Sequence, residues 1–146
     1  MERAKDGRLI YENDETLAQE RTAITVVAEK WGASVVKLPR RYSADFALLR
    51  TNSVKAWVEF KGRKNPMGKY PTYTVSLYKY MNLCALTRDT GIPSFLIVEW
   101  EDCVGYTPIP VEHQIIFSGR KDRGDWEDQE PMVEIANSAF RVIAFK

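Results

Sequence analysis

The segment from Tyr42 to Lys64 (YSADFALLRTNSVKAWVEFKGRK) constrains the fold of this chain more than any other stretch. Residues 44–50 and 54–61 are rich in strand-forming side chains, and the turn-forming residues 51–53 separate them. We therefore expect a β-hairpin. If its turn centres on Asn52, Asp45 lies directly opposite Glu59 on one face of the sheet.

Asp45, Glu59 and Lys61 form the first candidate site. The alternation of a strand places Lys61 on the face of Glu59, while Val58 and Phe60 point the other way into a core. Two opposed carboxylates destabilise a hairpin unless a cation separates them. Carboxylate oxygens suit Mg²⁺ or Mn²⁺, and the set lacks the histidine and thiol ligands typical of zinc. The alternative is that these charges simply keep an exposed hairpin soluble.

The distribution of charge singles out the same segment. Residues 37–88 contain eleven Lys or Arg and two acidic residues, a net charge of about +9, although the whole chain carries only +1. The two acids are Asp45 and Glu59. A basic surface of this kind attracts nucleic-acid phosphates. The two exceptions lie where a metal ion would be held.

A helix is expected before the hairpin. Possible N-caps lie at residues 13–16, and the apolar periodicity ends at Gly32. Glu20 falls on the apolar stripe between Leu17 and Ile24. A carboxylate directed inward needs a partner. It either supports the metal site or forms an edge salt bridge with Arg21 or Lys61.

A second helix is expected after the hairpin, from Tyr73 to Thr90, with Gly91 at its end. Lys79 falls on its apolar stripe. Lys79 could reach a phosphate or the acid cluster of Asp45 and Glu59, or it could cover the core with its methylenes. The apolar segment 94–100 then forms a strand joined to the hairpin by a crossover connection.

This order of elements resembles the core of the PD-(D/E)xK nuclease superfamily: a helix with Glu20, then Asp45, then Glu59-Phe60-Lys61, a helix and an apolar strand. The Glu20-Arg21 pair and the spacing of the acids are most similar to the small resolvases that cut four-way (Holliday) DNA junctions. The resemblance covers residues 14–100. It implies an α/β fold in which helices flank a central mixed β-sheet, with the αβββαβ core of restriction endonucleases.

The resemblance also implies a role for each matching residue. Asp45, Glu59 and the carbonyl of Phe60 are the metal ligands, Lys61 is the catalytic lysine, and Glu20 is the supporting acid.

Two positions depart from the family pattern. Ala44 stands where the motif has proline, and Lys79 stands where many members have glutamine or another lysine. The implied function is a metal-dependent DNA endonuclease that uses Mg²⁺, with Mn²⁺ as a substitute. The alternative is a catalytically inactive nuclease fold that binds DNA or a protein.

The segment 62–72 (GRKNPMGKYPT) is expected to be a loop beside the active site, because it follows Lys61 directly. Tyr70 and Tyr73 would pack on sugars or bases, or else the loop is merely solvated. The basic residues expected to contact DNA are Arg40, Arg41, Arg63, Lys64, Lys69 and Lys79.

The length of 146 residues fits a single domain, 1–146, with a core at about 14–110 and a C-terminal extension at about 111–146. Strands are expected at 104–109 and 139–145. The segment 118–131 is expected to be an exposed charged loop, with a mobile flap or a dimer contact as the alternatives. Without a membrane-length apolar run or a signal-peptide core, we expect a cytoplasmic protein. A junction resolvase would act as a homodimer.

Other catalytic classes find little support. Cys84 and Cys103 are expected to be reduced packing residues. His113 is the only histidine and is expected at the surface. Catalysis by a Ser-His or Cys-His pair would depend on this one residue.

Overall fold

The computed structural model describes residues 23–119 and 129–146. Residues 23–30 are helical, and the helix ends at Gly32, which has the left-handed conformation expected of a terminating glycine. The remaining elements are, in chain order, β1 (Ser34–Lys37), β2 (Phe46–Arg50), β3 (Ser53–Gly62), η1 (Met67–Lys69), β4 (Thr72–Ser76), α2 (Leu77–Thr90), β5 (Ser94–Glu99), β6 (Cys103–Ile109), β7 (Gln114–Gly119), β8 (Gln129–Ala136), η3 (Asn137–Ala139) and β9 (Arg141–Phe145).

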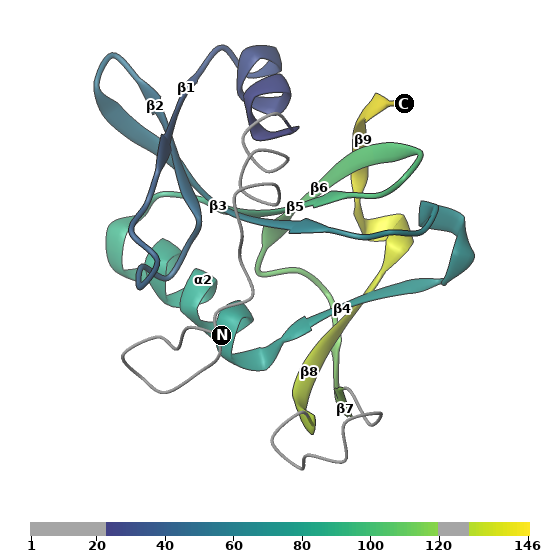
Figure 1. Ribbon diagram of the computed structural model, residues 1–146. Helices are drawn as coiled ribbons and strands as arrows, with labels where there is room; N and C mark the ends of the chain where they lie inside the picture. The colour runs from purple at the N-terminus through teal and green to yellow at the C-terminus, as the bar shows by residue number, and fades with distance from the viewer. Residues whose placement is uncertain (1–22, 120–128) are drawn as a thin grey trace, which may run out of the picture.

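The described strands form two sheets (Figure 1). The central sheet has the order β1-β2-β3-β5-β6-β9, and the smaller sheet has the order β4-β8-β7. In the central sheet β3 and β5 are parallel, while the other neighbouring strands are antiparallel. The expected mixed sheet of an α/β fold is confirmed. The chain crosses from β3 to β5 through β4 and α2.

The hairpin of β2 and β3 has the predicted register at the end that carries the site. Phe46 pairs with Val58, and the amide of Asp45 donates a hydrogen bond of 2.9 Å to the carbonyl of Val58. Asp45 precedes Phe46 and therefore lies beside Glu59.

The turn of the hairpin is tighter than expected. Thr51 and Asn52 both have positive φ, as a two-residue turn of the type that favours hairpins requires. A shorter turn alone would shift the register by one residue. A β-bulge at Lys55 restores the register, because Leu49 pairs with Val54 and Leu48 pairs with Ala56, which leaves Lys55 unpaired. The bulge and the short turn compensate for each other.

Both faces of the central sheet are covered. Helical residues 23–30 pack against Val58 and Phe60 on one face, as the alternation predicted. On the other face, α2 and the smaller sheet pack over Leu96 and Val98. Glu59 is on this second face, so its carboxylate lies under α2 rather than at an exposed surface.

The helix predicted from Tyr73 to Thr90 begins later than expected. Its end at Gly91 is confirmed, since Gly91 has φ of 72° and its amide donates to the carbonyl of Thr87. Residues 72–76 instead form β4, which pairs with β8. Tyr73 and Val75 alternate with polar residues, and both are buried in the core. These residues form a strand rather than a helix because β8, near the end of the chain, is available to pair with them.

The C-terminal part contributes strands to both sheets. β9 pairs with β6 in the central sheet, and β8 pairs with β4 in the smaller one. The segment 118–131, expected to be a loop, has its two ends in β7 and β8, whereas 120–128 lie outside the described residues. Strand β7 was not predicted. Glu20 and most of the predicted first helix also lie outside the described residues.

The remaining sequence expectations concern isolated residues. Cys84 and Cys103 are free thiols, as predicted. His113 is exposed, and its Nδ1 lies 3.1 Å from the hydroxyl of Tyr80 and 2.7 Å from the carbonyl of Val111. Among the described residues, no helix is long and apolar enough to cross a membrane.

Candidate active site

Glu59 is the centre of the candidate site. It is only 3% exposed, and in the described part of the chain no other charged residue is buried. Its pKa is raised from 4.5 to about 7, because burial and, next, the nearby charge of Asp45 raise it by more than Lys79 and Lys61 lower it. The ionised form of such a buried carboxylate is stable only when positive charge lies close to it.

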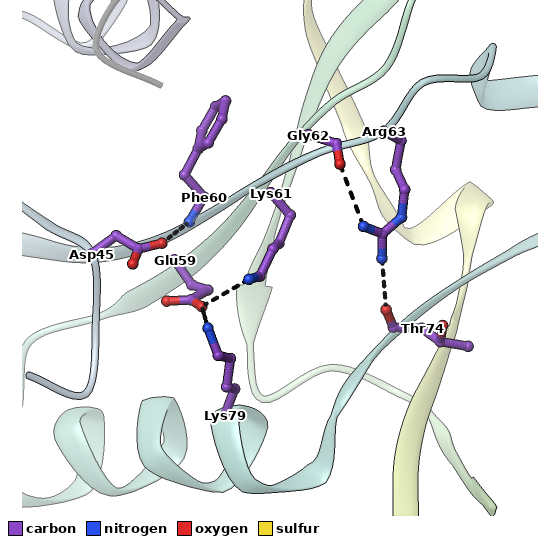
Figure 2. Close-up of polar contacts among 8 residues, drawn as sticks. All are labelled: Asp45, Glu59, Phe60, Lys61, Gly62, Arg63, Thr74 and Lys79. Atoms are coloured by element: carbon purple, nitrogen blue, oxygen red, sulfur yellow. Dashed lines mark hydrogen bonds and ion pairs between the residues drawn. The ribbon is translucent and has the colours of Figure 1, made fainter. Parts of the chain in front are cut away.

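Two lysines supply that charge (Figure 2). Lys79 Nζ donates a hydrogen bond of 2.8 Å to Glu59 Oε1, and Lys61 Nζ lies 3.9 Å from the same oxygen. Burial lowers the pKa of Lys61, and the neighbouring charge of Lys79 lowers it further. For Lys79, burial also disfavours the charged form, but the attraction and hydrogen bond of Glu59 outweigh it and raise the pKa. Of the roles left open for Lys79, the structure shows contact with the acid cluster.

Asp45 completes the cluster from the end of the loop that joins β1 to β2. Its Oδ2 accepts a hydrogen bond of 2.9 Å from the amide of Phe60. Its backbone is held on both sides, because its amide donates to Val58 and its carbonyl accepts from Leu38. The carboxylate is therefore fixed beside Glu59, although Asp45 precedes the regular strand.

The donor set is consistent with a hard divalent cation. Among residues 23–119 and 129–146, no group of three His, Cys, Asp or Glu side chains could hold a metal. Mg²⁺, however, is commonly held by one or two carboxylates and several waters. Asp45 and Glu59 supply two carboxylates.

The loop after β3 is anchored, which the sequence did not reveal. The amide nitrogen of Asn137 donates hydrogen bonds to the carbonyls of Met67 (2.8 Å) and Tyr70 (2.6 Å). The amide of Met67 donates to Asp102 Oδ1 at 2.9 Å. Because Asn137 is 70 residues from Met67 and 67 from Tyr70 along the chain, no local sequence signal could have identified it. These hydrogen bonds hold the loop in place against residues that are distant along the chain.

Arg63 and Tyr73, both predicted to contact DNA, have other partners. The guanidinium of Arg63 lies 4.4 Å from the ring centre of Tyr73 and donates to the carbonyl of Thr74 at 3.2 Å (Figure 2). Tyr73 itself is buried at 3% exposure, so it cannot pack on a sugar or base without unfolding of the core, and that expectation is wrong.

The remaining predicted DNA contacts in the two loops occupy exposed positions. Lys64, Lys69 and Tyr70 are exposed on the anchored loop, and Lys69 Nζ lies 5.5 Å from the ring centre of Tyr70. Arg40 and Arg41 are exposed on the loop that leads to Asp45. The two basic loops are therefore the one between β1 and β2, which ends at Asp45, and the one that follows β3, which carries Glu59 and Lys61.

Comparison with known proteins places the chain in a family. The profile of a family described as "Phage putative PDDEXK endonuclease" matches residues 6–143. This chain belongs to that endonuclease family. The match spans the acid cluster, and the resemblance to PD-(D/E)xK nucleases is confirmed.

A solved structure shows the same fold as this PDDEXK family member. Hjc, a Holliday junction resolvase from the archaeal hyperthermophile Archaeoglobus fulgidus, superposes with a TM-score of 0.58. The alignment covers 87% of this chain and 91% of Hjc, at 14% sequence identity. The central sheet of this PDDEXK protein is therefore built as in a resolvase. No curated protein matched the sequence.

Proposed function

We propose that this protein is a metal-dependent endonuclease that hydrolyses phosphodiester bonds in DNA. The observation that carries the proposal is the buried Glu59 beside Asp45, with two lysines on its carboxylate, in a member of an endonuclease family. A purely structural ion pair would not require a second fixed carboxylate beside it.

Asp45 and Glu59 would hold Mg²⁺, with the carbonyl of Phe60 as a further ligand and Glu20 as a supporting acid. Mn²⁺ would substitute. When bound, the ion would polarise the scissile phosphate and lower the pKa of a coordinated water. The hydrogen bond from the Phe60 amide keeps the Asp45 carboxylate oriented before any ligand arrives.

Lys61 would act on the reacting phosphate. Its side chain is about one-third exposed, on the face of Glu59. An ammonium there can orient the attacking water and stabilise the negative charge that develops on the phosphate oxygens. Burial, together with the charge of Lys79, lowers the pKa of this ammonium below that of a surface lysine.

The substrate would be bound by the two basic loops. Arg40, Arg41, Lys64 and Lys69 are exposed on them and would contact the DNA backbone. Arg63 would contribute its charge from the half-buried position over Tyr73. The resolvase-like fold favours a branched substrate such as a four-way junction.

A four-way junction would require two active sites, which a homodimer supplies. Strand β7 forms an edge of the smaller sheet, and Ile115 and Phe117 on it are 60% and 70% exposed. An edge strand with exposed apolar side chains favours pairing with a second chain. We propose this edge as the dimer contact.

The test is a cleavage assay on labelled duplex, single-stranded, flap and four-way-junction DNA in Mg²⁺, Mn²⁺ or EDTA. We expect metal-dependent cutting that is lost in Glu59→Ala and Lys61→Ala, while both variants remain folded by circular dichroism. Full activity in either variant would refute the site. If the folded wild type cuts none of these substrates but binds DNA, the protein is instead a catalytically inactive nuclease fold that binds DNA.

A further inference from the structure

Lys79 lies where a cation is electrostatically unfavourable. It is in the first turn of α2, which contains no acidic residue, and the N-terminus of a helix carries partial positive charge. Its side chain is 41% exposed, so it is also accessible from the surface. Lys79 therefore needs an anionic neighbour, and in this structure that neighbour is Glu59 at 2.8 Å.

The acid cluster is already balanced in charge. With all four side chains ionised, Asp45 and Glu59 carry two negative charges, and Lys61 and Lys79 carry two positive ones. A divalent cation would leave this group of residues with an excess of two positive charges. Furthermore, the oxygen of Glu59 that faces Lys61 is the one hydrogen-bonded by Lys79.

We propose that Lys79 is an internal counter-cation that competes with the divalent ion for Glu59 and turns to a DNA phosphate when the ion binds. The inference rests on the proposed function. A phosphate offers Lys79 the anionic partner that it loses, and it offsets the added charge of the ion. Metal and DNA then bind cooperatively, and the free protein holds the ion weakly.

The first measurement is Mn²⁺ binding to the DNA-free protein at pH 8.0, followed by electron paramagnetic resonance. Lys79→Gln removes the charge but keeps an N–H donor for Glu59, whereas Lys79→Arg keeps the charge. Lys55→Gln, at the exposed bulge of β3, is the matched control for net charge. Lys79→Ser is a second neutral variant in case the first does not fold.

We expect the neutral variants at position 79 to bind Mn²⁺ about tenfold more tightly than the wild type, since a positive charge beside a divalent ion is removed. Lys79→Arg and Lys55→Gln should match the wild type. Equal or weaker Mn²⁺ binding in folded Lys79→Gln would overturn the inference.

The second measurement repeats the titration with a phosphorothioate four-way junction that gel electrophoresis shows to be intact. The junction should tighten Mn²⁺ binding to the wild type by about tenfold or more, and to Lys79→Gln by clearly less. The same tightening in both proteins would refute the coupling through Lys79. If Asp45→Asn abolishes Mn²⁺ binding but the position-79 variants bind Mn²⁺ as the wild type does, the inference about Lys79 is refuted and the proposed function is not. If the wild type binds no Mn²⁺ with or without the junction, the proposed function is refuted.

Discussion

The burial of Glu59 should make the metal-free protein less stable at alkaline pH. Its pKa is raised from 4.5 to about 7, so folding favours the protonated form. The stabilising contribution is complete below pH 4.5 and is lost as the pH rises through 7. The loss amounts to roughly 3 kcal/mol of unfolding free energy. Glu59→Gln, which resembles the protonated acid, should not show it.

The assay is urea unfolding in EDTA at pH 5.0 and pH 8.0, followed by circular dichroism. At pH 5.0 the wild type and Glu59→Gln should have similar unfolding free energies. At pH 8.0 Glu59→Gln should be the more stable protein by roughly 3 kcal/mol, although it is expected to lack nuclease activity. Glu101→Gln, at an exposed position in the β5–β6 turn, is the control and should follow the wild type.

The result that would refute this reasoning is a parallel change with pH in the wild type and in Glu59→Gln. It would mean that Lys79 and Lys61 compensate fully for the burial of Glu59. A loss of stability in Glu59→Gln at both pH values would indicate instead that the ion pair holds α2 against the sheet.

Three other predictions follow from the site and its surroundings. Mg²⁺ should raise the melting temperature of the wild type at pH 8.0 but not that of Asp45→Asn, measured by differential scanning fluorimetry; an equal rise in both would exclude Asp45 as a ligand. Asn137→Ala should cost about 1–3 kcal/mol in urea unfolding, because the carbonyls of Met67 and Tyr70 lose their donor. It should also weaken DNA binding, and unchanged DNA binding would show that the loop does not contact DNA. Phe117→Lys should shift a dimer to monomer in light scattering, and a dimer that persists would place the interface elsewhere.

Much of the site could be predicted from the sequence because its spacing is local. The alternation of β3 fixes Glu59 and Lys61 on one face, and the hairpin register brings Asp45 beside them. The register was correct even though the turn was not, since the bulge at Lys55 compensates for the two-residue turn. A hairpin forms between residues that are close along the chain, so their strand and turn preferences are enough to predict it.

The features that the sequence did not reveal all depend on partners distant along the chain. Tyr73 was assigned to a helix, but it lies in β4 because β8 offers a pairing edge about 60 residues later. Asn137 fixes the basic loop from the far end of the chain.

The sequence by itself determined the α/β class, the acid pair with its lysine, and the ends of the helices at Gly32 and Gly91, because these depend on alternation and on local backbone preferences. Only the tertiary structure decided that α2 covers Glu59, so that the carboxylate is buried and paired with Lys79. Burial and ion pairing are set by the packing of α2 against the sheet, which no local pattern encodes.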